Sequence, residues 1–346
     1  MTTSLFETEI REQPAVLERL VRDGRGAAEA VAARIRGFDL RFAVLAARGT
    51  SDNAARYGQY LFGIRNQLVA ALAAPSLFTQ YQARPSLKGA LVIGISQSGQ
   101  SPDIVEVVRE GRRQGACTLA ITNDPASPLV AAAELALPLG AGPERAVAAT
   151  KTYTAQLATL AMLSAAMRGD EEGWAELARL PGLVSNAIDK NAGSPPRAAE
   201  FRDDARLVVV GRGYNLSTAF EIALKIKETC AIMTDGYSSA DFLHGPAAIL
   251  GEGLPVLIAA PGPRSFEDLE DVVRLVKERK ARLLAITDRP ALLEAAEVAM
   301  PVPEAPEWLS PIVAVVPGQL WALGLSLARG RHPDAPPGLS KVTLTR

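Results

Sequence analysis

Residues 90–101 read Ala-Leu-Val-Ile-Gly-Ile-Ser-Gln-Ser-Gly-Gln-Ser, an apolar run that ends in hydroxyl, amide and glycine residues. An apolar run without alternation is typical of a strand buried on both faces of a parallel sheet. A helical pattern begins at Asp103, so the polar segment precedes a helix N-terminus, where free backbone N–H groups and the helix dipole favour an anion. A serine in this place is usually an ordinary helix cap. Three serines and a glycine exceed what one cap needs, and we therefore predict a phosphate or sulfate site.

The chain carries a long-range internal repeat. Residues 42–49 (Phe-Ala-Val-Leu-Ala-Ala-Arg-Gly) are similar to residues 207–213 (Leu-Val-Val-Val-Gly-Arg-Gly), and residues 119–125 are similar to residues 284–290. The two matches have nearly the same offset along the chain. A constant offset over two separated matches predicts the duplication of a whole domain and not a short solenoid repeat.

Each half alternates short apolar runs with amphipathic stretches, as a parallel sheet covered by helices on both faces requires. The helix expected from residue 103 shows this pattern, because its apolar residues recur at helical spacing while Glu106, Arg109 and Glu110 fall on the opposite face. We predict an α/β fold of two tandem, doubly wound parallel-sheet domains, each a three-layer α/β/α sandwich, with N-terminal helices and a C-terminal tail. The expected strands are residues 42–47, 68–72, 90–95, 117–122, 207–210, 230–234, 255–259 and 282–286.

The same patterns give the expected domain boundaries. Residues 5–38 read as helices with a break at Pro14, and residues 153–195 read as a helical bridge between the halves. The expected segments are an N-terminal helical segment (1–38), a first α/β domain (39–170), a helical linker (171–198), a second α/β domain (199–330) and a tail (331–346).

Composition excludes several classes of protein. Lys and Arg number 37 against 38 Asp and Glu, which leaves no excess positive charge for binding nucleic acid or an anionic membrane. Cys117 and Cys230 lie in apolar or helical stretches, so buried thiols are expected and not a disulfide framework. The first residues lack the basic and apolar regions of a signal peptide, and no uninterrupted apolar run reaches the length of a membrane-spanning helix. A cytoplasmic protein with a small-molecule partner is expected.

Ligands of doubly wound sheets bind beyond the carboxyl ends of the strands. Gly49-Thr50-Ser51 follows the first expected strand, so it is expected at the same sheet edge as the serine segment 96–101. A turn with a helix cap is the alternative for this loop. Neither loop has the spacing of a Walker A or a dinucleotide fingerprint, which favours a small phosphorylated metabolite over a nucleotide.

Candidates for chemistry lie in the second half. Glu221, Lys225 and Glu228 are spaced i, i+4 and i+7, so they project from one face of a helix. Such a pattern commonly marks a helix face that is exposed to solvent and held by ion pairs. The functional alternative is that the charged face lines a cleft. His244 precedes Gly-Pro in a loop that would hold the ring in one orientation, although a lone histidine is more often a structural hydrogen-bonding residue. His332, in a polar loop, is expected at the surface.

Taken together, these motifs resemble the sugar isomerase (SIS) domains of glucosamine-6-phosphate synthase and its relatives. The resemblance covers nearly the whole chain, and it rests on six stretches in the family's order: Gly49-Thr50-Ser51, Ser96-Gln97-Ser98-Gly99, Ala149-Thr150-Lys151, Glu221 to Glu228, His244-Gly245-Pro246 and Leu339-Ser340-Lys341-Val342-Thr343. It implies two SIS domains and a homodimer with a shared active site.

The resemblance also implies roles for individual residues. Glu228 would move a proton between C1 and C2 of the sugar, His244 would assist ring opening from the neighbouring subunit, and Lys341 would engage the open-chain carbonyl. Lys225 would pair with Glu221 or Glu228 to orient them. The substrate-binding residues that it implies are Thr50, Ser51, Ser96, Gln97, Ser98, Ser101, the backbone around Val147 and Ala149, and Ser340. No cofactor is expected, and no cluster of His and Cys suggests a metal site.

The chain also departs from the synthase pattern. Those enzymes carry a glutaminase domain with an N-terminal cysteine nucleophile, whereas this sequence starts Met1-Thr2 and reaches the SIS region within about 40 residues. Ala149 stands where the synthases usually have serine, Gln100 where they have glutamate, and Ser101 where they have threonine.

These departures favour an aminosugar-phosphate deaminase that converts glucosamine 6-phosphate to fructose 6-phosphate and ammonia. The enzymatic alternatives are a phosphosugar isomerase, a fructosamine-phosphate deglycase, or the isomerase subunit of a glutamine:fructose-6-phosphate aminotransferase that lacks its glutaminase domain. A non-catalytic sugar-phosphate sensor is the alternative from another class. A sensor needs only the phosphate-binding residues, so the joint presence of Glu228, His244 and Lys341 favours an enzyme.

Overall fold

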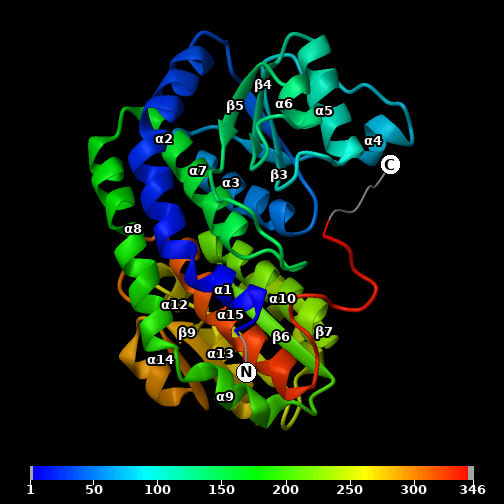
Figure 1. The fold of residues 1–346 in the computed structure, drawn as a ribbon. Helices are drawn as coiled ribbons and strands as arrows, with labels where there is room; N and C mark the ends of the chain where they lie inside the picture. Colours follow the sequence, from blue (N-terminus) through cyan, green and yellow to red (C-terminus); the bar gives the residue numbers. More distant parts are fainter. Residues whose placement is uncertain (1–2, 342–346) are drawn as a thin grey trace. The chain divides into compact units, whose positions relative to one another are not determined.

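The computed structural model describes residues 3–341, with the side chain of Ser265 left out, and contains two five-stranded parallel sheets (Figure 1). The strand orders are β2-β1-β3-β4-β5 and β7-β6-β8-β9-β10, which is the same order in both halves. Corresponding strands start at equivalent places, for example Phe42 and Arg206, or Cys117 and Arg282, so the offset of the sequence repeat is kept in the structure. The duplication and the two tandem doubly wound sheets predicted from the sequence are confirmed.

The strands are short and mostly buried. Their bounds are β1 (Phe42–Ala46), β2 (Ala70–Leu72), β3 (Ala90–Ser96), β4 (Cys117–Thr122), β5 (Leu135–Pro138), β6 (Arg206–Gly211), β7 (Met233–Ser238), β8 (Pro255–Ala259), β9 (Arg282–Thr287) and β10 (Val298–Pro301). All seven residues of β3 and all five of β8 are buried, as expected for central strands of a sheet covered on both faces.

Two sequence-based expectations about strand and helix ends were wrong, and two edge strands were missed. The strand expected at residues 230–234 is β7, which starts only at Met233, because helix α10 (Leu216–Cys230) ends at Cys230 and is capped by Ala231 in the left-handed conformation. The edge strands β5 and β10 were not predicted, since each has four residues, is only partly buried and ends in proline. The break expected at Pro14 lies at Glu12, and Pro14 falls in the first turn of helix α2 (Gln13–Ile35), where a missing N–H costs little.

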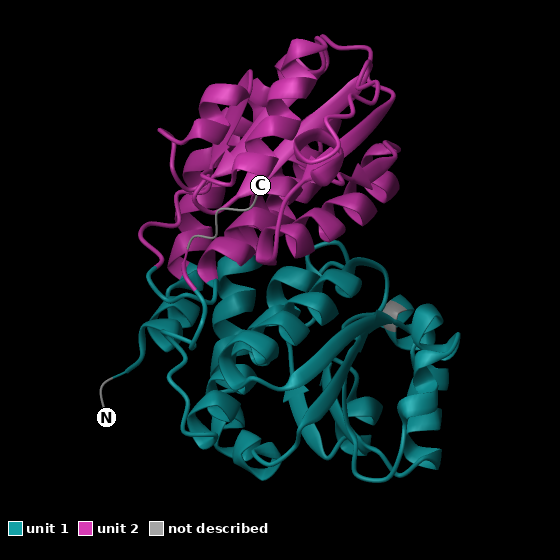
Figure 2. Cartoon of the chain, turned by 90° about the vertical axis from the view of Figure 1, so that its right-hand side faces the viewer, with its two compact units in different colours: residues 1–14, 145–150, 180–339 teal, residues 15–144, 151–179, 340–346 magenta. Residues whose placement is uncertain are grey.

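Contact clustering divides the chain into two compact units (Figure 2). Unit 1 comprises residues 1–14, 145–150 and 180–339, and unit 2 comprises residues 15–144, 151–179 and 340–346. Each unit contains one sheet and segments from distant parts of the sequence. Each terminal segment belongs to the unit of the sheet that is more distant in the sequence. The N-terminal residues belong to the unit of the second sheet, and the C-terminal residues belong to the unit of the first sheet.

Helices cover both faces of the sheet in unit 2. Helices α3 and α7 pack together on one side, and α5 and α6 pack on the other. Their bounds, with those of the neighbouring helices, are α2 (Gln13–Ile35), α3 (Thr50–Asn66), α4 (Ser76–Thr79), α5 (Pro102–Arg113), α6 (Pro128–Ala132), α7 (Lys151–Arg168) and α8 (Glu171–Lys190). Helices α2 and α8 continue across the division between the units.

Two glycines allow α5 to approach the sheet closely. A Cβ on Gly94 of β3 would lie 2.7 Å from Val108 of α5, and a Cβ on Gly111 of α5 would lie 2.9 Å from Val92 of β3. One sequence-based expectation about α5 was wrong: Glu110 is buried and not exposed, because it packs beneath Arg113 and Gln114, which hydrogen-bond its carboxylate. The close contact of α5 with β3 fixes the loop between them.

Unit 1 is built in the same way around its own sheet. Helices α10 and α15 pack together against one face, and α11, α13 and α14 cover the other. The bounds are α1 (Leu5–Arg11), α9 (Ser194–Arg197), α10 (Leu216–Cys230), α11 (Ser239–Leu243), α12 (Pro263–Glu267), α13 (Glu270–Glu278), α14 (Pro290–Ala295) and α15 (Ser310–Ala328), with 3₁₀ turns at Ala198–Phe201, Gly213–Asn215 and Pro246–Ile249. Helix α15 is long and apolar enough to cross a membrane, but 89% of its apolar window is buried, as in a core helix.

Candidate active site

Two loops in unit 2 carry the hydroxyls predicted to bind phosphate. Strands β1 and β3 pair in parallel, so the loops that follow them emerge at the same edge of the sheet. Arg48, after β1, joins the loops because its Nε donates to Asp103 Oδ2 at 2.7 Å. Asp103 is fully buried in the first turn of α5. Thr50 and Ser51 therefore lie at the same sheet edge as the serine segment, as the sequence predicted.

Three hydroxyl oxygens in these loops accept hydrogen bonds from fixed N–H donors. Ser96 Oγ accepts from Gly99 N at 3.0 Å, and Ser98 Oγ accepts from Gln100 N at 3.3 Å. Ser51 Oγ accepts from the side chain of Gln156. A hydroxyl has one hydrogen to donate, and within residues 3–341 no acceptor is recorded for the hydrogens of these three serines. Such an arrangement presents several O–H donors together, which suits a phosphate group.

The two remaining predicted phosphate ligands lie on either side of Ser98 and Gly99. The Gln97 carbonyl accepts from Asn123 N at 3.1 Å, which fastens the loop to the end of β4. Ser101 is the N-cap of α5, and its side chain makes no capping bond. Gly99 has a φ of +65°, and a Cβ there would lie 2.3 Å from Ser127 Oγ. Only glycine fits this position, and its absence of a side chain lets the loop pack against α6.

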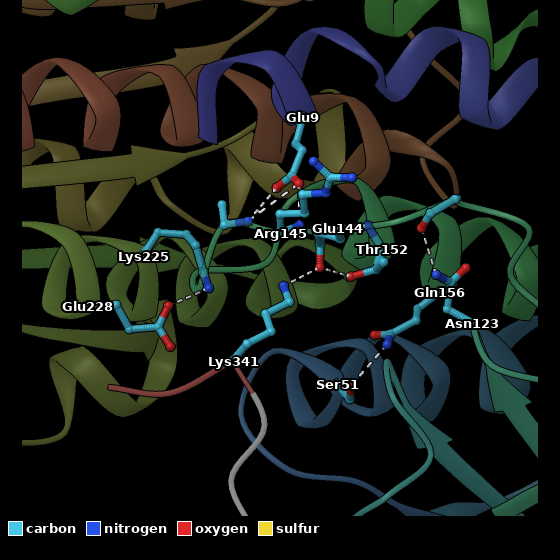
Figure 3. A network of polar contacts seen from close by, with 12 residues as sticks. Glu9, Ser51, Asn123, Glu144, Arg145, Thr152, Gln156, Lys225, Glu228 and Lys341 are labelled. Atoms are coloured by element: carbon cyan, nitrogen blue, oxygen red, sulfur yellow. Dashed lines mark hydrogen bonds and ion pairs between the residues drawn. The ribbon is translucent and has the colours of Figure 1, made fainter. Parts of the chain in front are cut away.

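The predicted carbonyl-binding lysine of the tail is held by a buried carboxylate. Lys341 Nζ donates to Glu144 Oε2 at 2.8 Å, and the Glu144 side chain is completely buried (Figure 3). The same carboxylate accepts from Thr152 N at 3.0 Å and from Thr152 Oγ1 at 2.7 Å, at the start of α7. Ser340 is exposed. The motif residues Val342 and Thr343 lie outside the described residues.

The segment predicted to touch the sugar through its backbone belongs to unit 1. Val147 N donates to the Asp334 carbonyl at 3.0 Å, and the buried carboxylate of Glu9 accepts from the N–H groups of Arg145 and Ala146 (Figure 3). Ala149 lies two residues after Val147 and is half-buried. These bonds fix the backbone around Val147 independently of its side chains.

Helix α10 in unit 1 carries the charged face. Lys225 is completely buried, and its Nζ lies 3.4 Å from Glu221 Oε1 and 2.5 Å from Glu228 Oε2 (Figure 3). The Glu221 side chain is also completely buried, whereas that of Glu228 is 24% exposed. A solvated face is therefore excluded, and Lys225 pairs with both carboxylates as predicted. An accessible carboxylate held by a buried ammonium has a fixed orientation, as a proton-transferring group requires.

His244 lies at the C-terminal end of α11 and is exposed. Its backbone N donates to the Ala240 carbonyl at 3.1 Å. Leu243, the preceding residue, and Ile249, five residues further along the chain, are apolar and exposed by 42% and 52%. His332 is exposed, as expected.

Sequence reasoning missed three polar residues, each of which holds a segment with predicted site residues inside its own unit. Gln156 lies in the stretch 155–163, which is apolar apart from Gln156 itself and Thr159, and Glu144 and Glu9 lie in stretches without a motif. Each of them bonds to a residue 105 to 197 positions away in the sequence, and no local pattern points to that partner. The one available signal was the presence of an amide in the apolar helix α7.

The sequence model of the SIS domain matches residues 41–166 and 200–329. The chain belongs to the SIS domain family. Its SIS domains coincide with the two parallel sheets and their helices, and the two matches together cover well over half of the chain.

The similar proteins include aminotransferases, candidate phosphosugar isomerases and a deaminase. The glutamine–fructose-6-phosphate aminotransferase (isomerizing) of Thermococcus kodakarensis is 35% identical over 96% of this SIS chain, which spans 56% of that relative's length. A candidate phosphosugar isomerase from Silicibacter pomeroyi DSS-3 has a TM-score of 0.88 and 35% identity, and the match covers 96% of this chain and 100% of that one. A glucosamine-6-phosphate deaminase from Thermotoga maritima, with a TM-score of 0.79, 20% identity and coverage of 99% and 100%, shares the fold.

Proposed function

We propose that this SIS protein is an isomerising aminosugar-phosphate deaminase, which converts glucosamine 6-phosphate and water to fructose 6-phosphate and ammonia. The observation that carries the proposal is the contact between Glu228 and Lys225. A carboxylate that is 24% exposed and is held at 2.5 Å by a fully buried ammonium is suited to take a proton from one carbon and return it to the next.

The serine-rich loops of unit 2 support a phosphorylated substrate. Ser51, Ser96 and Ser98 each accept one hydrogen bond from the protein and can donate to a phosphate oxygen. The helices that begin at Thr50 and Pro102 add favourable dipoles. We assign these residues to the phosphate and not to the reaction.

The remaining steps are assigned to His244 and Lys341. His244 moves a proton from the C1 hydroxyl to the ring oxygen, and the bond between C1 and that oxygen breaks, which opens the sugar ring. Glu228 then moves a proton from C2 to C1, which converts the open-chain aldehyde and its C2 amine into a C2 imine. Water adds to this imine and ammonia leaves, so that a C2 ketone remains. Lys341, held by Glu144, supplies positive charge to the carbonyl oxygen.

A second candidate is the isomerase part of a glutamine–fructose-6-phosphate aminotransferase. The observation that favours it is the 35% identity to such an enzyme over 96% of this chain. That reaction uses ammonia and fructose 6-phosphate, so the two candidates differ in direction and share the proton transfer at Glu228. A phosphosugar isomerase, a fructosamine-phosphate deglycase and a sugar-phosphate sensor are the other candidates that the assay must separate.

The decisive experiment incubates the purified protein with glucosamine 6-phosphate and measures ammonia and fructose 6-phosphate. Wild type should release both in equal amounts, and Glu228→Gln should lose at least a hundredfold in kcat, as expected for a group that transfers a proton. Glu252→Gln, an exposed glutamate in the loop before β8, is the matched control and should retain activity.

Other outcomes identify the other candidates. Interconversion of glucose 6-phosphate and fructose 6-phosphate without ammonia release from glucosamine 6-phosphate would indicate a phosphosugar isomerase. Formation of glucosamine 6-phosphate only when glutamine or ammonia is supplied would favour the aminotransferase. Release of an amino acid from a fructosamine phosphate would indicate a deglycase. Binding without any turnover would indicate a sensor.

We further propose a cytoplasmic homodimer in which His244 serves the partner subunit. The exposed Leu243 and Ile249, one residue before and five residues after His244, support an interface at this segment, because apolar side chains at a protein surface favour contact with a partner. Mixing Glu228→Gln and His244→Ala subunits should restore about a quarter of wild-type activity, since half of the dimers would be mixed and each would hold one intact site. Mixtures that stay inactive after verified subunit exchange would contradict a shared site.

A further inference from the structure

Gln156 is a buried amide in the second turn of helix α7. Its residue has no exposed surface, and its Nε2 donates to Ser51 Oγ at 2.9 Å (Figure 3). Ser51 lies in the first turn of α3 and is 7% exposed. Both residues belong to unit 2, and they are 105 positions apart in the sequence.

The burial of this amide is costly. Its neighbours on α7 include Ala155, Leu157 and Leu160, all fully buried. Burial of an amide in such surroundings costs free energy unless its hydrogen bonds are replaced. Gln156 Oε1 makes no hydrogen bond with any residue that the structure describes, so the side chain uses only part of its capacity. A leucine or methionine would pack here at lower cost, which suggests that the remaining bond, to Ser51, has a purpose.

The purpose follows from the chemistry of the serine hydroxyl. A hydroxyl both accepts and donates, and its hydrogen rotates to suit its neighbours. Since Gln156 Nε2 occupies an acceptor position of Ser51 Oγ, the Ser51 hydrogen points elsewhere. The hydroxyls of Ser96 and Ser98 are set in the same way by backbone N–H groups. Ser51 is the one of these three serines whose donor is a side chain, and it can therefore be tested by substitution.

We propose that Gln156 is a positioning residue for substrate phosphate, which keeps the Ser51 hydroxyl as a donor to a phosphate oxygen. The proposal rests on the proposed sugar-phosphate substrate and adds a residue that touches no part of that substrate. It predicts that Gln156 determines the affinity for the phosphate and leaves the proton transfer at Glu228 unchanged.

The test compares two substitutions at Gln156. Gln156→Met removes the donor and keeps the approximate volume, so the KM for glucosamine 6-phosphate should rise about tenfold with kcat within about twofold, the effect of one hydrogen bond. Gln156→Glu should raise the KM about a hundredfold, because a carboxylate only accepts and would both capture the Ser51 hydrogen and repel the phosphate. Calorimetric titration with inorganic phosphate should show the same order of affinities without any turnover.

The matched control is Ser164→Ala. Ser164 is also fully buried on α7 and also bonds to a residue of α3, since its Oγ donates to Asn66 Oδ1 at 2.6 Å. This change disturbs the contact of α7 with α3 and leaves Ser51 untouched. The KM should stay within about twofold of wild type even where the melting temperature falls.

A double substitution shows whether Gln156 acts through Ser51. The affinity of Ser51→Ala for phosphate should be no weaker when Gln156→Met is added, because the bond is already absent. Additive losses would overturn the proposal, as would Gln156→Met binding phosphate as tightly as wild type. Should Gln156→Met not fold, Gln156→Leu takes its place. Wild type that binds neither phosphate nor glucosamine 6-phosphate would overturn the proposed function as well, whereas tight binding by every Gln156 variant would overturn only the role of Gln156.

Discussion

Glu144 holds Lys341 across 197 positions of sequence. The Lys341 ammonium lies 2.8 Å from a carboxylate oxygen that is completely buried, and the Lys341 side chain is 23% exposed. Thr152 donates two hydrogen bonds to the same carboxylate, so the Glu144 side chain is held at the start of α7 and does not move freely with the tail. The lysine predicted to meet the sugar carbonyl is thus placed by a residue that no motif indicated.

Replacement of Glu144 by glutamine should loosen the tail. The amide keeps part of the hydrogen bonding and loses the ion pair, so kcat for glucosamine 6-phosphate should fall about tenfold, as expected from the loss of a charge-assisted bond. Trypsin should also cleave after Lys341 faster, which mass spectrometry can follow. Glu134→Gln, which removes an exposed pair with Arg34, is the control. Unchanged cleavage and kcat in Glu144→Gln would show that the pair does not hold the tail.

Gly99→Ala should damage the phosphate loop in two ways. The φ of +65° disfavours any side chain, and the new Cβ would meet Ser127 Oγ at 2.3 Å. Gly115→Ala provides the control, because Gly115 has a φ of +76° with nothing within 4 Å of the added atom. We expect denaturant unfolding to show a loss for Gly99→Ala that exceeds that of Gly115→Ala by about 1 to 3 kcal/mol. Equal losses would mean that the contact with Ser127 relaxes freely.

Glu110 should make stability depend on pH in acid. The hydrogen bond from Arg113, helped by Gln114, lowers the pKa of Glu110 from 4.5 to about 2. Because the unfolded chain takes up this proton first, the contribution to stability is complete above pH 4.5 and is lost as the pH falls towards 2. Arg113 is 55% exposed, so solvent limits the contribution to about 1 kcal/mol. Urea unfolding of Glu110→Gln should show a weaker fall in stability over this range; a fall as steep as that of wild type would refute it.

The two cysteines should be unreactive in the folded protein. Burial raises the pKa of the Cys117 thiol to about 12 and that of the Cys230 thiol to about 11, so neither is a thiolate at pH 8. Both should react with a disulfide reagent only after unfolding in guanidinium. The unfolded chain, with the ordinary thiol pKa of 9, loses these protons at a lower pH than the folded protein does. The free energy of unfolding should therefore fall as the pH rises from 9 towards 12. Rapid modification of the folded protein at pH 8 would contradict this prediction.

The sequence predicted the central strands well and the sheet edges poorly. β3 and β8 are buried along their whole length, so their residues form continuous apolar runs, whereas the edge strands β5 and β10 combine four residues of mixed burial with a terminal proline. The start of β7 was misplaced because Cys230 ends a helix whose last turn is as apolar as a strand.

The candidate site divides in the same way. Serine loops and charged helix faces are local patterns, and the ion pairs of Lys225 with Glu221 and Glu228 lie within two turns of one helix. The supporting residues Glu144 and Gln156 bond to residues that are far away in the sequence. A single polar residue forms no spacing pattern with such a distant partner, so the sequence alone does not predict the contact.

The exchange of terminal segments between the units has a consequence for folding kinetics. The backbone N–H groups of Leu5 and Phe6 bind the carboxylate of Asp334, 328 to 329 residues away, and Gln13 binds Gln319, 306 residues away. Contacts of such sequence separation close the largest loops that this chain can form, and their entropic cost is met only after most other contacts exist. Helix α1 should therefore be the last part of unit 1 to acquire protected amides during refolding.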